Sequence, residues 1–279
     1  MSEEVIRSDV ATDNLVPTPP FWGTRMLENI PVRSLVPYIN KTMLYQFQWG
    51  YKKGGKKKEE YWEWAKQEVD PVLNRMLREV EAENIQQPQA IYGYFPAQSE
   101  GNEVILYKDP EGHEELHRFG FPRQDGKKHL CIADFFRAKD SGEMDVVALQ
   151  AVTVGQNASD VARQWFNEDR YTDYLYLHGL NVETTEALAE WVHKQIRAEL
   201  GFSSEDARDP MALLKQGYRG SRYSFGYPAC PNLEDQRPLL DILGGERLGI
   251  VMADEQQMHP EESTSAIVCH HPEAKYFSV

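Results

Sequence analysis

The sequence lacks the cysteine patterns that cross-link small secreted domains or hold structural zinc. Its 279 residues include three cysteines, Cys131, Cys230 and Cys269, an odd number with no CxxC spacing. Neither a disulfide framework nor a zinc site is therefore indicated. The reducing cytoplasm is the location that this cysteine usage favours.

Long apolar runs and an excess of positive charge are also missing. No stretch of about 18 apolar residues occurs, and the polar N-terminus has no apolar segment typical of a signal peptide. The 30 Lys+Arg against 44 Asp+Glu give a formal charge of −14, which repels nucleic acid and anionic membranes. We therefore expect no nucleic-acid partner and no membrane role.

Familiar catalytic motifs are absent as well. No glycine-rich GxGxxG turn follows a strand, so a Rossmann-type nucleotide cradle is not encoded, and P-loop, GxSxG and HExxH motifs do not occur. His270 and His271 are adjacent, but neighbouring residues on a strand point to opposite faces. A structural role for this pair is favoured over metal ligation.

The chain contains enough apolar residues, 41%, to fill a sizeable core. Apolar spacing changes from helical to strand-like and back along the sequence, which predicts an α+β fold rather than regular βαβ alternation. The expected order is helix over 33–48, helix over 59–83 broken at Asp70-Pro71, strands over 90–153 with a hairpin across 99–102, and helices over 157–179 and 181–200, the last with Asn181 as N-cap. Residues 1–16 are predicted to be a disordered acidic lead, and 17–279 a single domain.

One loop carries most of the functional signal. Residues 217–231 read GYRGSRYSFGYPACP, so that Arg222 stands four residues ahead of a GYPACP turn. Pro228 and Pro231 fix the backbone, Gly226 permits a tight turn, and arginine offers a planar fork suited to a carboxylate. For an average loop of this composition, a structural turn with a solvated arginine is the more common interpretation. The specific order of residues in this loop favours a binding loop instead.

The pattern RxxxGYPACP resembles the signature of the activation domain of cobalamin-dependent methionine synthase, which binds S-adenosylmethionine. The resemblance extends from about Pro17 to the last residue. Besides this loop it rests on four segments: AIYGYFPA at 90–97, CIADF at 131–135, EALAEWVH at 186–193 and HPEAKYF at 271–277.

The resemblance implies a twisted antiparallel sheet flanked by helices, and it implies a site. Arg222, Gly226 and the backbone beside Ser224 would hold the methionine end of S-adenosylmethionine. Tyr276 and Phe277 would complete the site, although by default both would be read as a core-facing strand edge. Tyr227, the tyrosine of GYP, is the catalytic candidate, close to where the corrinoid approaches.

Acidic residues are expected near the ligand's ammonium group. Glu186 lies at the margin of the apolar stripe of the 181–200 helix and could border the site, although helix N-terminal charge complementarity would also explain it. Glu190 points away from that stripe and is expected to be solvated. Asn40 stands where many family members have aspartate, so it supplies an acceptor without charge.

The implied function is reductive methylation of cob(II)alamin, reactivating methionine synthase with S-adenosylmethionine as methyl donor and flavodoxin or ferredoxin as electron donor. The chain has no DxHxxG motif, so the cobalamin would be carried by a partner module. Two alternatives remain: a sensor or assembly module that binds S-adenosylmethionine without methyl transfer, and a methyltransferase acting on another substrate. Met1 and the acidic lead favour a free-standing subunit over a piece of a longer enzyme.

A cluster of lysines follows the first predicted helix. The five residues are Lys52, Lys53, Lys56, Lys57 and Lys58, around a mobile Gly54-Gly55 pair. A solvated loop is the default interpretation of such a run. The functional alternative is that it attracts an acidic electron carrier to an otherwise anionic protein.

Overall fold

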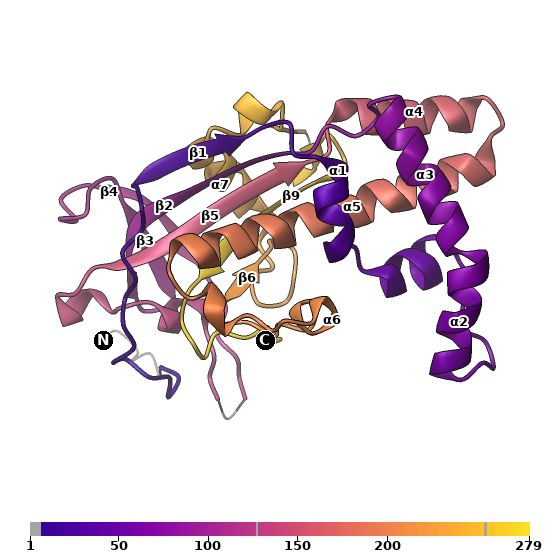
Figure 1. The fold of residues 1–279 in the computed structure, drawn as a ribbon. Helices are drawn as coiled ribbons and strands as arrows, with labels where there is room; N and C mark the ends of the chain where they lie inside the picture. Colours follow the sequence, from indigo (N-terminus) through magenta and orange to yellow (C-terminus); the bar gives the residue numbers. More distant parts are fainter. Residues whose placement is uncertain (1–6, 127, 254–255) are drawn as a thin grey trace.

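The structure is a computed structural model that describes residues 7–253 and 256–279 except residue 127. Its centre is an antiparallel sheet of seven strands in the order β4-β3-β2-β5-β9-β6, with β1 beside the same edge of β2 as β3 (Figure 1). The strands are β1 (Gly23–Leu27), β2 (Gln89–Glu100), β3 (Glu103–Tyr107), β4 (Glu115–Gly120), β5 (Asp145–Thr153), β6 (Ser221–Tyr223) and β9 (Ser263–Cys269). A separate small hairpin pairs β7 (Val251–Met252) with β8 (Met258–His259).

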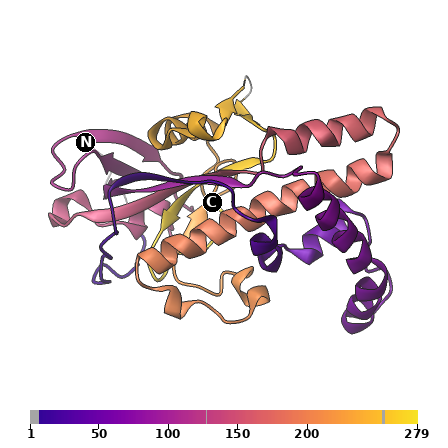
Figure 2. The same cartoon turned by 45° about the horizontal axis from the view of Figure 1, so that its top comes forward.

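Both faces of the sheet are covered, as Figure 2 shows with the sheet seen nearly edge-on. Helix α5 (Tyr171–Glu199) crosses one face, and α7 (Gln236–Leu243) lies over the other. Alternate residues of β2 belong to two separate hydrophobic cores: Tyr92 packs on the α5 side of the sheet and Ile91 on the α7 side. This two-sided burial explains why β2 and β5 read as nearly continuous apolar runs.

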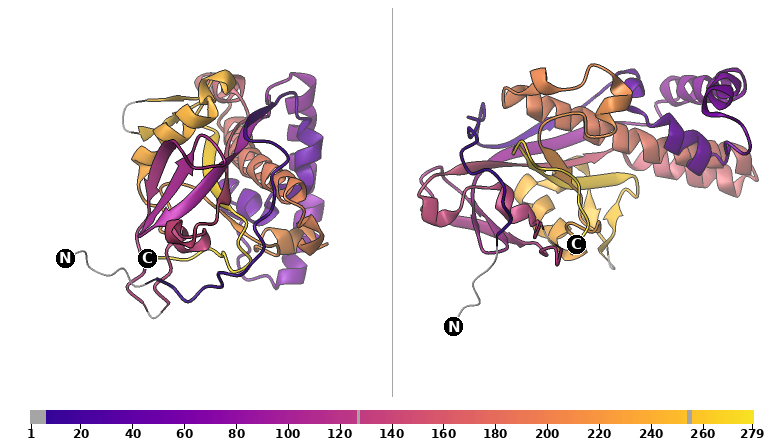
Figure 3. Two further views of the ribbon diagram at one scale, coloured as in Figure 1. Left: turned by 90° about the vertical axis from the view of Figure 1, so that its left-hand side faces the viewer. Right: turned by 90° about the horizontal axis from the view of Figure 1, so that it is seen from below.

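The remaining helices gather at one end of the molecule, which is therefore elongated (Figure 3). Among them, α3 begins at Asp70-Pro71, where the sequence predicted a helix break, with proline in the first turn. These helices are α1 (Val32–Leu35), α2 (Lys58–Glu68), α3 (Asp70–Ala82) and α4 (Gln156–Asn167), with a π-helical segment η2 (Met43–Gln48) between α1 and α2. Short elements elsewhere are α6 (Pro210–Leu213) and the 3-10 turns η1 (Val36–Tyr38), η3 (Ile132–Phe135), η4 (Lys139–Ser141), η5 (Ser203–Glu205), η6 (Leu233–Asp235) and η7 (Gly245–Leu248).

The predicted α+β class and the hairpin across 99–102 are confirmed, and the prediction of a helix start at Asn181 is wrong. Helix α5 runs unbroken through this position for 29 residues. The Asn181 side chain is buried, donates to the carbonyl of Ala158 at 3.1 Å and accepts from Gln86 at 2.8 Å. A typical capping residue is accommodated inside the helix because α4 and the segment before β2 satisfy its amide.

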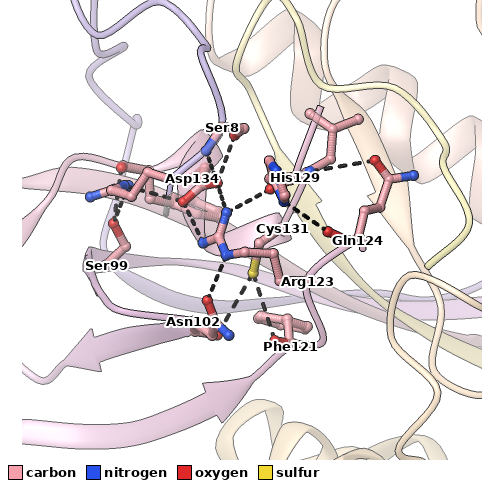
Figure 4. A network of polar contacts seen from close by, with 12 residues as sticks. Ser8, Ser99, Asn102, Phe121, Arg123, Gln124, His129, Cys131 and Asp134 are labelled. Atoms are coloured by element: carbon pink, nitrogen blue, oxygen red, sulfur yellow. Dashed lines mark hydrogen bonds and ion pairs between the residues drawn. The ribbon is translucent and has the colours of Figure 1, made fainter. Parts of the chain in front are cut away.

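The prediction of disorder over residues 1–16 fails for its second half; residues 1–6 lie outside the described part. Ser8 donates both its amide and its hydroxyl to Asp134, at 2.9 and 2.6 Å, as Figure 4 shows. Arg137 donates to the carbonyl oxygens of Thr12 and Asn14. Polar composition predicted that this segment has little apolar surface to bury, but hydrogen bonds to buried partners fix it instead. Across the described residues, no helix is long and apolar enough to cross a membrane.

Candidate functional site

A cavity of about 460 Å³ opens between α5, η2, the loop after β6 and the C-terminal tail. Its walls bring together six of the eight site residues that the sequence predicted, drawn from segments more than 200 residues apart. They are Asn40, Glu186, Arg222, Ser224, Tyr227 and Tyr276. Gly226 and Phe277 do not line this cavity.

Strand β6 aims Arg222 into the cavity. Its neighbours Ser221 and Tyr223 are fully buried, and strand alternation turns Arg222 to the opposite side, toward α5. Gly220 allows the entry into β6: its φ is +82°, and a Cβ there would lie 2.4 Å from the carbonyl oxygen of Cys269. The guanidinium donates from one arm to Glu190 at 2.8 Å and from the other to Glu186 at 3.2 Å.

The two glutamates on α5 differ from each other, and the prediction for Glu190 is wrong. Glu190 is 4% exposed and is contacted by Arg222, Arg197 and the Tyr218 hydroxyl. Glu186 reaches Arg222 from the open side of the cavity, with 48% of its side chain exposed. The prediction assumed that the side of α5 opposite its apolar stripe faces solvent. Because α5 is packed on two sides, that side is covered as well.

A buried ion network continues behind Glu190. Arg197 is fully buried and forms two hydrogen bonds to Asp206, at 2.8 and 2.9 Å. Burial, and then the charge of Glu190, raise the pKa of the Tyr218 hydroxyl to about 12, so Tyr218 stays neutral in the cavity wall. Glu190 therefore holds Arg222 in place and is itself held by Arg197.

A third glutamate, Glu183, lines the same cavity and was missed by the sequence interpretation. It is 4% exposed, and its one side-chain partner among the described residues is the Gln48 amide at 3.5 Å. Burial raises its pKa to about 7. The signal was present: positions 183, 186 and 190 fall within an arc of about 60° on a helix.

Asn40 and the two tyrosines form the rim. The Asn40 side-chain oxygen Oδ1 accepts from the amides of Thr42 and Met43, both at 3.2 Å, so it caps the turn that leads into η2. The rings of Tyr227 and Tyr276 meet edge to face with centroids 6.3 Å apart, and the side chains are 53% and 42% exposed. Aromatic surface thus stands open to solvent at the mouth of a charged cavity.

Comparison with known proteins decides the family. Residues 31–279 match the family model described as vitamin B12 dependent methionine synthase, activation domain. The chain belongs to this family. It is 43% identical to a methionine synthase of Mycobacterium tuberculosis and 42% identical to one of Mycobacterium leprae, over 98% of the chain but 24% of each relative. The chain thus spans about a quarter of the length of these curated relatives.

A solved structure described as the MetH reactivation domain bound to AdoHcy shares the fold. The TM-score is 0.84 at 24% identity, covering 95% of this activation domain and 83% of that chain. This likeness agrees with the antiparallel sheet and flanking helices predicted from the sequence.

Two predicted residues of this activation domain lie outside the cavity. Gly226 adopts a φ of +88° and donates its amide to the carbonyl of Cys230 at 2.9 Å, which closes the GYPACP turn. Phe277 is buried on the α7 side of the sheet, against Phe135 and Tyr223. For Phe277 the structure shows the core-facing position that the sequence offered as its default.

The histidine pair has structural partners. His270 Nε2 lies 2.6 Å from a buried Asp145 oxygen, and His271 Nε2 donates to the carbonyl of Ala11 at 2.8 Å. These contacts join β9, β5 and the N-terminal segment, in agreement with the structural role favoured for both residues.

Proposed function

We propose that this activation domain binds S-adenosylmethionine in the cavity and presents its methyl group to a cobalamin carried by a separate module, which restores an oxidised methionine synthase. The observation that carries the proposal is the convergence of Arg222, the α5 glutamates and the rim tyrosines on one cavity in a member of this family. The AdoHcy bound by a protein of the same fold supports it, because AdoHcy is the demethylated product of the proposed donor.

The charges of the cavity suit the charges of the ligand. S-adenosylmethionine carries a carboxylate, an ammonium and a sulfonium. A guanidinium can bind the carboxylate, a carboxylate can bind the ammonium, and electron-rich groups can contact the sulfonium. The exposed Glu186 releases its arm of Arg222 to the ligand carboxylate and turns to the neighbouring ammonium. The buried Glu190 keeps the other arm, so the guanidinium stays oriented during the exchange.

Methyl transfer requires little acid or base catalysis from the residues of this chain. The corrinoid, when held by its own module and reduced by one electron, supplies the cobalt nucleophile. The methyl–sulfur bond breaks with its electron pair left on sulfur, so no proton needs to be moved. The cavity residues bind and orient the donor, and Tyr227, which is exposed at the rim, would contact the approaching corrinoid.

The decisive experiment combines the chain with cob(II)alamin-loaded methionine synthase lacking its own activation domain, a one-electron reductant and S-adenosylmethionine. We expect the absorbance spectrum of methylcobalamin and stoichiometric S-adenosylhomocysteine when all components are present. Binding of S-adenosylmethionine with no methylation would favour the sensor or assembly role. Methyl transfer without the cobalamin module would favour an independent methyltransferase.

The electron donor, flavodoxin or ferredoxin, is also part of the proposal, and the lysine loop supports it. The side chains of Lys52, Lys53, Lys56, Lys57 and Lys58 are exposed. They lie in the segment that runs from η2, which lines the cavity, to the first residue of α2. Replacing all five by serine should slow reductive methylation at low salt and flatten its dependence on ionic strength, because steering is screened by salt. Stopped-flow kinetics measure this, with unchanged S-adenosylmethionine affinity as the control; identical rates at every ionic strength would exclude steering by this loop.

A further inference from the structure

Residues 7–14 cross the protein surface as a strap in which neither a helix nor a strand forms. Two side chains anchor the strap from opposite ends. Asp134 accepts the amide and the hydroxyl of Ser8, and Arg137 donates to two carbonyl oxygens that follow Ala11. Ala11 lies between the two anchors, so Arg137 holds the middle of the strap even where Ser8 is released.

Ala11 is clasped by the C-terminal tail, residues 271–279. Its amide donates to Glu273 Oε1 at 2.8 Å, and its carbonyl accepts from His271 Nε2 at 2.8 Å. Burial lowers the pKa of His271, so the ring stays neutral and its Nδ1 accepts the amide of Glu273 at 3.1 Å. The two side chains that satisfy the backbone of Ala11 therefore also brace each other.

The clasped end of the tail leads directly to the cavity. The amide of Ala274 donates to the carbonyl of His271 at 3.0 Å, which closes a turn. Two residues later Tyr276 lines the cavity, and its amide donates to the side chain of Gln216 at 3.1 Å. The described residues that line the cavity include none of the strap. Any influence of the strap on the cavity must therefore pass through the tail.

We propose that the strap positions Tyr276 at the cavity rim by clasping the C-terminal tail, so that seating of the strap and binding of S-adenosylmethionine favour each other. The ligand part of this inference rests on the proposed function. A ligand that packs on Tyr276 holds the tail in place, and a tail held in place keeps Glu273 and His271 against Ala11. Thermodynamic linkage makes this coupling reciprocal, so the ligand must also hold the strap.

The first test needs no ligand and breaks one hydrogen bond from either end. Ala11→Pro removes the amide of the strap without altering the tail, and Glu273→Ala removes its acceptor, which is an exposed side chain. Hydrogen exchange of the full chain, followed by mass spectrometry, should be about threefold faster in the tail peptide around Tyr276 for both variants. Glu273→Gln keeps an oxygen acceptor and should exchange like wild type. Unchanged tail exchange in Ala11→Pro would overturn the proposed positioning.

The second test measures the reciprocal effect. Saturating S-adenosylmethionine should slow exchange of the wild-type strap about threefold or more and leave strand β4 unchanged, because β4 does not line the cavity. Tyr276→Ala, again at saturation, should lose the protection of the strap. Equal strap exchange with and without bound ligand would overturn the coupling. Calorimetry on the same samples separates the two claims: a wild-type chain that binds no S-adenosylmethionine would reject the proposed function, whereas a tail that responds to Ala11→Pro would still support the clasp.

Discussion

Two charged clusters on opposite sides of the sheet contain the same kinds of side chain in different balance. In the Asp134 cluster, one carboxylate receives Arg7, Arg123 and Ser8 (Figure 4). In the cavity, Glu186 and Glu190 share Arg222, and Glu183 beside them has no cationic partner among the described residues. In the first cluster, side chains of the protein neutralise the carboxylate completely. In the second, the carboxylates outnumber the cations that contact them.

The difference appears in the pKa values. Burial alone would raise the pKa of Asp134, but the hydrogen bonds from Arg123 and Ser8 outweigh it and the pKa is lowered. At Glu183 burial outweighs the one long hydrogen bond from Gln48, and the pKa rises to about 7. Similar carboxylates in similar burial thus serve two ends: the compensated one stabilises the fold, and the uncompensated one is available to a ligand.

The largest expected effect is on stability. Asp134→Ala should lower the free energy of unfolding by about 4 kcal/mol, because it leaves the half-buried Arg123 without its carboxylate and releases the Ser8 segment. Urea denaturation measures the loss. If the comparison holds, the affinity for S-adenosylmethionine stays within twofold of wild type; a parallel loss of binding would show that the two clusters are coupled.

Arg222→Ala should weaken ligand binding and leave stability largely unchanged, the reverse of the effect expected for Asp134→Ala. We expect a loss of about 3 kcal/mol in S-adenosylmethionine affinity by calorimetry, since a desolvated carboxylate would lose a charged, two-armed partner. Glu190 keeps Arg197, so the fold should survive. A folded Arg222→Ala protein with wild-type affinity would remove Arg222 from the site.

Glu183→Gln should stabilise the ligand-free protein. A carboxyl whose pKa rises from its ordinary value of 4.5 to about 7 on folding destabilises the native state fully above pH 7, and this penalty is relieved as the pH falls toward 4.5. We expect a gain of about 2 to 3 kcal/mol at pH 8 that shrinks steadily by pH 5. Thermal unfolding at several pH values checks this; a gain that does not depend on pH would mean that Glu183 is already compensated.

The smallest effect concerns Asn40. Asn40→Asp should keep the cap on Thr42 and Met43 and add a negative charge at the cavity rim. We expect S-adenosylmethionine to bind tighter by about 1 kcal/mol if the ligand ammonium is nearby. Calorimetry at low and high salt would reveal it, and weaker binding would place the ammonium away from this rim.

The sequence predicted features that depend on local chemistry. The break at Asp70-Pro71 follows from proline's missing amide, and the hairpin across 99–102 follows from strand periodicity interrupted by turn residues. The apolar run at 130–136 was harder: it forms the 3-10 turn η3 instead of a strand, because a short apolar run has no distinguishing period.

What failed depended on contacts between distant segments. Asn181 and Glu190 are both polar residues on α5, and the sequence assigned them to a helix end and to solvent. Both are buried, because α4, the segment before β2, β6 and Arg197 approach the helix from several sides and satisfy their side chains. Helical periodicity reports which side of a helix is apolar, but not how many sides are covered.

The sequence by itself determined the α+β class, the loop around Arg222 and most of the residues that meet at the cavity, because these depend on local backbone preference and on motifs shared with the family, RxxxGYPACP among them. The tertiary structure alone decided which carboxylates are paired. Glu183, Glu190 and Asp134 are all buried acidic residues, and they differ in the cations that folding brings to their carboxylates: two arginines each for Glu190 and Asp134, and none among the described residues for Glu183.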